Sequence, residues 1–289
     1  LFQKDLLKKK FQAFDPGFDW KNKLLFTEHH QSHAASAFFP SPFEDAVVLT
    51  MDGVGEWATT TMGGGDGTSL EIREELRFPH SIGLLYSAFT AFLGFEVNEG
   101  EYKVMGMAPY GSPRYVDKVW KVVRQYDDGS IWLDPRYFSF HHSTSKSFTR
   151  RFAGLFGEPR DSNVPFFTEA TGYPSYYGER PRNFSEMVRY NQYYADIAAS
   201  IQEATEQIIV NVANELHRRT GSSRLCLAGG VALNSVANAR ILRETPFEEL
   251  YVQPSAGDGG GALGAALFAW HCGLGNSKRF VMDHASWGQ

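Results

Sequence analysis

The sequence predicts an α/β fold in which a mixed five-stranded sheet is flanked by helices. Three short apolar runs, at residues 45–52, 224–228 and 247–252, have the length and composition of buried strands. Segments with helical periodicity lie before and after the last two runs, which is the alternation expected around parallel strands. Two further strands, predicted below, complete the sheet.

The N-terminal part is predicted to lead into a helix that carries histidines. Residues 1–20 predict a short helix and a loop, and residues 23–27 predict a short strand. The segment 28–39 predicts a helix, because its three alanines favour helix and Pro40 ends it.

Two more strands and two helices are predicted after the first apolar run. Residues 56–63 and 70–78 predict strands joined by short turns, so the first three strands form an antiparallel meander. The apolar periodicity of 81–95 predicts a helix, and 113–126 predicts another.

The segment from about 127 to 181 is rich in aromatic residues, Pro and Gly, and it is too aromatic for a disordered linker. We expect an ordered insertion that shapes a pocket. Its aromatic residues either stack on a sugar or, as we favour, form a core for the insertion. They are Trp132, Tyr137, Phe138, Phe140, Phe166, Phe167, Tyr173, Tyr176 and Tyr177.

The C-terminal part alternates helices with the last two strands. The longest helix is predicted at 184–220 and is capped by Gly221. Further helices are predicted at 233–243 and 260–272, followed by an irregular tail.

The resulting order is β-β-β-α, insertion, α-β-α-β-α, which is the order of one half of an actin/hexokinase/Hsp70-like fold. Residues 45–289 would form this second half. Residues 1–44 would be the remnant of an incomplete first half, with the histidine helix.

Composition excludes some function classes. The net charge of −5 gives no basic footprint, which argues against nucleic-acid binding as the main activity. No apolar stretch reaches the roughly 18 residues needed to span a bilayer, and no signal peptide is evident. Only two cysteines occur, which fits a reducing, cytoplasmic compartment. The chain does not begin with Met, so we expect a fragment of a longer protein.

His29 and His33 are spaced to share one face of a helix, and Asp52 ends a buried strand. Two imidazoles at this spacing can converge on one metal ion. The pattern therefore predicts a His, His, Asp metal site at the mouth of the sheet. The alternative is a packed or surface cluster. The glutamate of a zinc metalloprotease is absent, because His30 stands in its place.

Two glycine-rich segments each follow a strand and open a helix. Glycines there let a backbone approach a ligand, and the helix N-terminus offers N–H groups to an anion. The first segment contains Gly229, Gly230, Val231 and Asn234, whose amide can bind a ribose or a base. Its alternative is a tight turn without a ligand. Neither segment is a Walker A loop or a dinucleotide fingerprint.

The second segment contains Gly257, Asp258 and Gly259. Asp258 follows a strand, as Asp52 does, so both carboxylates are expected at the same cleft. The alternative role of Asp258 is an N-cap, and the two roles are compatible.

With these residues assembled, the chain resembles the NodU/CmcH-type O-carbamoyltransferases of nodulation-factor and antibiotic biosynthesis. The resemblance covers about the whole chain. It rests on the segments 28–38, 52–56, 103–111, 228–234 and 257–264. The family's first domain is similar to Kae1, which has the actin-like fold.

The resemblance implies a set of roles. His29, His33, Asp52 and Asp258 match the family's metal ligands, a site said to hold iron, so Fe(II) is expected. Mixed His and carboxylate ligands also suit Zn or Mn. The glycine segments would contact ATP, with Mg on the nucleotide as an option. Lys103 would neutralise phosphate as the candidate catalytic residue, unless it is only a solvated lysine.

Family members form carbamoyl-adenylate from carbamoyl phosphate and ATP in a YrdC-like domain. The Kae1-like domain then transfers the carbamoyl group to a hydroxyl of a small-molecule or sugar acceptor. The chain departs from the family pattern, since it lacks the N-terminal strand pair with its Asp and His and stops where the YrdC-like domain should begin. A homodimer is compatible with the resemblance.

Two other functions remain open. One is threonylcarbamoyl transfer to tRNA, against which the acidic charge, His30 and the insertion count. The other is a non-catalytic module that binds a nucleotide or a metal. It would bind ATP without turnover.

Overall fold

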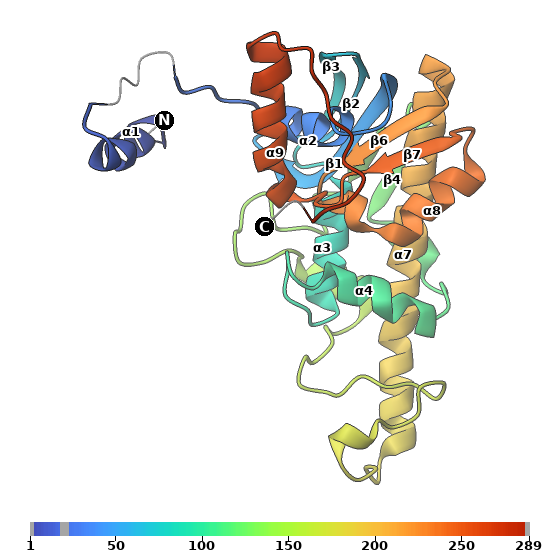
Figure 1. Cartoon of the computed structure of the whole chain (residues 1–289). Coiled ribbons are helices and arrows are strands. Elements are labelled where there is room, and N and C mark those ends of the chain that lie inside the picture. Colours follow the sequence, from blue (N-terminus) through green and yellow to red (C-terminus); the bar gives the residue numbers. More distant parts are fainter. Residues whose placement is uncertain (1–2, 18–22, 287–289) are drawn as a thin grey trace.

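The structure is a computed structural model, and it describes residues 3–17 and 23–286 (Figure 1). Part of the predicted N-terminal helix and loop, and the end of the tail, lie outside these residues. A five-stranded sheet has the order β3-β2-β1-β6-β7. Its strands are β1 (Asp45–Gly55), β2 (Ala58–Asp66), β3 (Ser69–Arg77), β6 (Arg224–Ala228) and β7 (Glu249–Val252). The first three strands are antiparallel and β1, β6 and β7 are parallel, so the predicted mixed sheet is confirmed.

The helices cover both faces of the sheet (Figure 1). On one side lie α2 (His29–Phe38) and α9 (Asp258–Phe268), and on the other lie α3 (Ile82–Phe92) and α7 (Phe184–Thr220). The strand period of two explains this, because alternate residues of β1 enter different cores. Val48 packs with α2 and α9, whereas Leu49 and Met51 pack with α3 and α7.

The remaining elements extend around these layers. They are α1 (Gln3–Phe14), α4 (Glu101–Met107), α5 (Val116–Val119), β4 (Val123–Gln125), β5 (Ile131–Leu133), α6 (Arg150–Phe156) and α8 (Ser235–Glu244). In Figure 1, α1 lies apart from the layers, and it buries none of its residues. No helix in the described part of the chain is long and apolar enough to cross a membrane.

Two predicted elements are wrong. Residues 23–27 do not form a strand, and none of the described strands pairs with them. The predicted helix at 113–126 is reduced to α5, after which the chain enters β4. The reason is tertiary: Val123 is buried and pairs with Leu133 of β5, which outweighs local helical periodicity.

The insertion packs its aromatic residues on α3. The rings of Phe152 and Phe156 lie 4.7 Å apart, and each lies 5.0 Å from Phe89. All three side chains are fully buried. Beyond them the segment reaches the N-terminal end of α7, where Tyr176 and Tyr177 are exposed (Figure 1).

The contact between α2 and α9 is unusually close. A Cβ atom at position 264 would lie 1.7 Å from the carbonyl oxygen of Ser32, so only glycine fits there. Alanines at 34, 35 and 37 make α2 a narrow helix that is almost wholly buried.

The C-terminal end of α2 is held by Arg279. Its guanidinium donates hydrogen bonds to the carbonyl oxygens of Phe38, Phe39 and Ser41, at 3.0, 3.2 and 3.3 Å. It thereby satisfies carbonyl groups that a helix end leaves unpaired.

Candidate metal centre

The first turn of α2 places two histidines on one face. The side chain of Glu28 accepts a hydrogen bond from the helix backbone, and the Gln31 amide oxygen accepts one from Glu28 N at 3.2 Å, so the helix begins at His29 with a capping box. His33 follows one helical turn later. The predicted helix and its i, i+4 geometry are confirmed.

The end of β1 fixes the carboxylate of Asp52. Its Oδ1 accepts a hydrogen bond from Gly53 N at 2.7 Å. Ser81 Oγ lies 3.0 Å from Asp52 O and 2.7 Å from Gly53 O, so the N-cap of α3 holds the strand at this point. Oδ2 is left to face the histidines.

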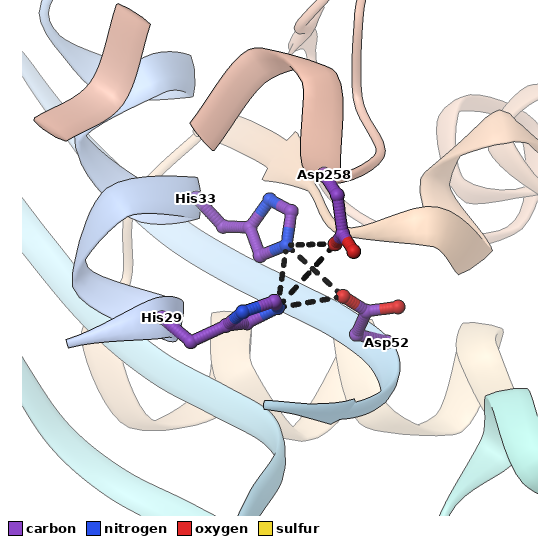
Figure 2. A group of neighbouring side chains, drawn as sticks. All are labelled: His29, His33, Asp52 and Asp258. Atoms are coloured by element: carbon purple, nitrogen blue, oxygen red, sulfur yellow. Dashed lines mark hydrogen bonds and ion pairs between the residues drawn. The ribbon is translucent and has the colours of Figure 1, made fainter. Parts of the chain in front are cut away.

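Four side chains from α2, β1 and α9 converge (Figure 2). The Nε2 atoms of His29 and His33 lie 3.0 Å from each other, and each lies 3.0 Å from Asp52 Oδ2. Asp258 Oδ1 lies 3.6 Å from His29 Nε2 and 3.5 Å from His33 Nε2. The four ligand atoms all lie within 4.8 Å of one another.

These separations fit a divalent ion. Two ligand atoms about 2.1 Å from one ion, at a right angle to each other, lie about 3.0 Å apart. The three shorter separations match that value. Nitrogen and carboxylate oxygen donors of this kind suit Fe(II), Zn or Mn.

Burial differs among the four ligands. The side chain of His33 is 1% exposed, whereas that of Asp258 is 79% exposed. Asp258 is the first residue of α9, and the N-cap is Gly257, so the structure does not use Asp258 as the cap. Its position in the first helical turn is favourable for a carboxylate. The site is therefore closed at His33 and open to solvent at Asp258, and His29, whose side chain is 27% exposed, lies between these extremes.

The charges of the cluster already compensate each other. The hydrogen bond with Asp52 raises the pKa of His29, against the opposing effect of burial. Burial would raise the pKa of Asp52, but hydrogen bonds from the two histidines hold it well below its usual range. Asp52 is thus ionised and ready to bind a cation.

His30 points away from the cluster and docks α2 on the sheet. Its Nδ1 lies 2.6 Å from Thr50 Oγ1, and its Nε2 lies 3.0 Å from the carbonyl oxygen of Ala58. Burial lowers its pKa to about 4, so it is neutral at pH 7. No pattern in the sequence indicated this docking role, because His30 stood out only by its place in the motif.

One polar atom of the site has no partner. His33 Nδ1 is buried and forms no hydrogen bond within the described part of the chain. Metal-bound histidines usually donate this second N–H to an oxygen acceptor. The ring of His33 therefore lacks the hydrogen bond from Nδ1 that usually orients a metal-binding histidine.

The first glycine turn, residues 229–234, lies next to the cluster on the side of Asp52. Gly229 has φ of +92°, and a Cβ atom there would lie 2.1 Å from the carbonyl oxygen of Met51. A Cβ atom on Gly230 would lie 3.1 Å from Asp52 Oδ1, so this turn lies next to a ligand. Val231 is the next residue of the same turn.

Asn234, at the end of this turn, already has partners. Its Oδ1 caps α8 by accepting a hydrogen bond from Ala237 N at 3.1 Å. Its Oδ1 also accepts a hydrogen bond from Gln202 Nε2 at 3.0 Å, and its Nδ2 donates one to Gln202 Oε1 at 3.1 Å. Gln202 in turn accepts from Tyr86 OH and donates to Glu206. Sequence patterns did not reveal this amide pair, because its members are 32 residues apart in the chain.

The second glycine turn carries Asp258 into the cluster. The backbone of Gly257 is extended, and a Cβ atom there would lie 3.8 Å from Leu233 of the first turn. Gly259 faces Ser255 Oγ. Both turns therefore border the same site, as the sequence predicted for Asp52 and Asp258.

Lys103 is exposed on α4, and the structure does not bring it into contact with the four ligands. Its Nζ lies 5.9 Å from the ring centre of Phe95 and 5.7 Å from that of Tyr102. Two residues on, Met105 Sδ lies 4.0 Å from Ser235 Oγ at the start of α8. The helix that carries Lys103 thus faces the first glycine turn.

A family model and several curated relatives match most of the chain. A family model described as Carbamoyltransferase N-terminus matches residues 3–267. The uncharacterized protein sll1178 of Synechocystis sp. is 49% identical, over 96% of this chain and 42% of that protein. Nodulation protein NolNO of Sinorhizobium fredii is 33% identical, over 92% of this chain and 37% of that protein. Nodulation protein NolO of Bradyrhizobium diazoefficiens is 34% identical, over 83% of this chain and 37% of that protein.

Solved structures show a weaker likeness. HypF of T. kodakarensis is 15% identical, with a TM-score of 0.43, over 93% of this chain and 39% of that chain. A likeness at this TM-score carries no conclusion about the fold.

The chain spans about two fifths of the length of sll1178, NolNO and NolO.

Proposed function

Because the chain belongs to the carbamoyltransferase family, we propose that it forms the metal- and nucleotide-binding part of an O-carbamoyltransferase. The whole reaction would transfer a carbamoyl group from carbamoyl-adenylate, made from carbamoyl phosphate and ATP, to a hydroxyl group. The acceptor is a small molecule or a sugar. The proposed fold is one half of an actin-like, Kae1-like architecture.

The observation that carries the proposal is the convergence of four ligands from three distant segments. His29 and His33 come from one helix, Asp52 from a strand and Asp258 from a helix more than two hundred residues later. Three ligand atoms 3.0 Å apart, one of them on a buried imidazole, support this proposal over that of a loose surface cluster.

A bound ion, proposed as Fe(II), would act as a Lewis acid toward phosphate or carbamoyl oxygen. The chain itself holds the ligands in place. Ser81 fixes the strand at Asp52, His30 docks α2 on β1 and β2, and the closely packed α9 delivers Asp258. The open side of the site, at Asp258, is where substrate would enter.

The glycine turns would receive the adenine nucleotide, with Mg as a further option. Gly229, Gly230 and Val231 offer backbone close to Asp52, and Gly257 and Gly259 lie at the N-terminus of α9, which favours an anion. Asn234 would contact the nucleotide only by exchanging its bond with Gln202. Lys103 would approach the phosphates from α4.

Metal content tests the proposal most directly. The purified chain should hold nearly one equivalent of metal by inductively coupled plasma mass spectrometry. His33→Ala and Asp258→Ala should each lose most of it. His141→Ala, at an exposed histidine of the insertion, is the matched control and should keep it. Metal that persists in Asp258→Ala would refute a joint site.

A further inference from the structure

Residues 53–57 comprise the end of β1 and the two-residue turn to β2, and they form one rim of the metal cluster. We call them the 53–57 turn. It begins directly after Asp52, and a Cβ atom on Gly55 would lie 2.0 Å from Cδ2 of His29, so the turn lies against that ring. Its backbone is held at both ends. Ser81 Oγ donates to Gly53 O at 2.7 Å, and Phe78 N donates to Trp57 O at 2.8 Å.

Glu56 within this turn has a strained backbone. Its φ is +62°, in the left-handed region that Cβ-bearing residues avoid. Among the described residues, Asn98 at +71° is the other non-glycine with positive φ, and asparagine tolerates this region better. Such strain persists where the surrounding structure imposes it, and it is enriched at ligand sites.

The side chains of the turn face solvent. Trp57 is 71% exposed and Val54 is exposed, so a large aromatic surface stands unpacked on a rigid turn. Glu56 is exposed and makes no hydrogen bond or ion pair within the described part of the chain. Its neighbour Gly55 lies against the ring of His29, so Glu56 follows directly after the contact with the cluster.

We propose that Glu56 and Trp57 hold the acceptor, an inference that rests on the proposed function. Trp57 stacks on the apolar face of a neutral ring that bears several hydroxyl groups, as a sugar does. The Glu56 carboxylate accepts a hydrogen bond from the hydroxyl that is to be carbamoylated. Both residues touch substrate, and neither is needed to hold the metal.

The exposed tyrosines of the insertion are a poorer place for the acceptor. They lie at the N-terminal end of α7, whereas Gln202 of the same helix contacts the first glycine turn. The helical rise from Phe184 to Gln202 is about 27 Å. A ring bound at that end would be remote from the cluster, whereas the 53–57 turn lies against His29.

Three variants of the chain test the inference: Glu56→Gly, Trp57→Ala and the strain control Asn98→Gly. Each is measured for metal content, for Tm, and for binding of methyl β-glucoside by ligand-observed NMR titration. Glu56→Gly should raise Tm by about 2 °C, because strain is relieved. It should weaken sugar binding by about tenfold, and Trp57→Ala should do the same. Asn98→Gly should leave sugar binding unchanged, and all three should keep the metal.

Three results would overturn the inference. Loss of metal or a lower Tm in Glu56→Gly would make the turn a structural part of the metal site. Unchanged sugar binding in Glu56→Gly and Trp57→Ala would remove the proposed contacts. Absence of methyl β-glucoside binding to the wild-type chain would refute the acceptor class. If the proposed function is wrong, the wild-type chain should contain no metal. That result differs from each of the three results above, so the two failures can be told apart.

Discussion

Two strand–glycine–helix units flank the site, and they look alike in the sequence. We call β6, Gly229 to Asn234 and α8 the first unit, and β7, Gly257 to Asp258 and α9 the second unit. Both begin with a parallel strand and open a helix with glycines. The structure gives their glycines different neighbours.

In the first unit the critical glycine lies in the turn. Gly229 passes over the backbone of β1 at Met51, with a positive φ that disfavours any other residue. Asn234 then caps α8 and pairs with Gln202. This unit is held to the sheet and to α7, behind the ligand Asp52.

In the second unit the crowded glycines lie inside the helix: a Cβ atom on Gly260 would lie 2.1 Å from the carbonyl oxygen of Ser255, and Gly264 is more crowded still. Gly257 in the turn has room for a side chain, whereas Gly264 touches the backbone of α2 at Ser32. This unit is held to the helix that carries His29 and His33. Glycine-rich turns after strands thus predict close approach, but the group approached can be protein backbone rather than a ligand.

The largest effect is expected at Gly264. Gly264→Ala should destabilise the chain by about 4 kcal/mol, because the new Cβ meets a backbone carbonyl that cannot move alone. Metal should be lost with it, as α9 and α2 separate. Urea unfolding and metal content measure both effects.

The matched control is Gly261→Ala in the same helix, where the nearest atom to the new Cβ is 4.0 Å away. It should be neutral or stabilising by up to about 1 kcal/mol. Equal effects at the two positions would show that α2 and α9 are not packed as described.

Gly229→Ala should cost about 3 kcal/mol, from the left-handed backbone and from the clash with Met51 O. Metal binding should weaken less than in Gly264→Ala, because both histidines and Asp258 remain in place. Unfolding by urea, together with a metal titration, checks this order. A variant as stable as wild type would contradict the close approach of the first turn to β1.

Acid should destabilise the chain through His30, which docks α2 on β1 and β2, and α2 in turn packs against the second unit. The pKa of His30 is about 4 in the folded chain and about 6.5 when unfolded. Between these values the unfolded chain binds a proton that the folded chain does not, so stability falls as pH drops below about 6.5 and is fully present above it. At pH 5 the loss is about 2 kcal/mol.

The opposite sign applies to His29, whose raised pKa favours the folded chain at low pH. The effect of His30 is therefore measured as the difference between wild type and His30→Gln, without metal, by urea unfolding at pH 7 and pH 5. Hydrogen exchange should show α9 losing protection in acid before α8 does. An equal pH dependence in both proteins would remove His30 as the group responsible.

The smallest effect on stability is expected at Gly257. Gly257→Ala should change the free energy of unfolding by less than about 0.5 kcal/mol, because its backbone is extended and the nearest atom is 3.8 Å away. If the second turn binds nucleotide, ATP affinity measured by calorimetry should fall in this stable variant. An unchanged affinity would confine the nucleotide to the first unit.

Local sequence signals predicted the parts whose causes are local. The helix at 184–220 has the predicted bounds, because its apolar period is long and Gly221 adopts the left-handed cap. The strand at 224–228 also has the predicted bounds. The ligands of α2 could be grouped by spacing alone, since i and i+4 share a helix face.

Contacts between distant segments could not be predicted in this way. The hairpin of β4 and β5 replaced a predicted helix because Val123 found a partner ten residues later. The pairing of Gln202 with Asn234 and the docking of His30 on Ala58 depend on how layers stack, which no local pattern records. The nucleotide roles of the glycines and of Lys103 stay predictions.

The arginine that holds the end of α2 makes the chain's cleavage by trypsin informative. Lys278 is exposed, whereas the neighbouring Arg279 has its guanidinium occupied by carbonyl groups of residues 38–41. Trypsin must bind the basic side chain in its own pocket, so it can cleave after Lys278 but not after Arg279 while that guanidinium is occupied. Cleavage after Arg279 would then signal release of the histidine helix, so the ratio of two adjacent peptides reports whether the metal site is assembled.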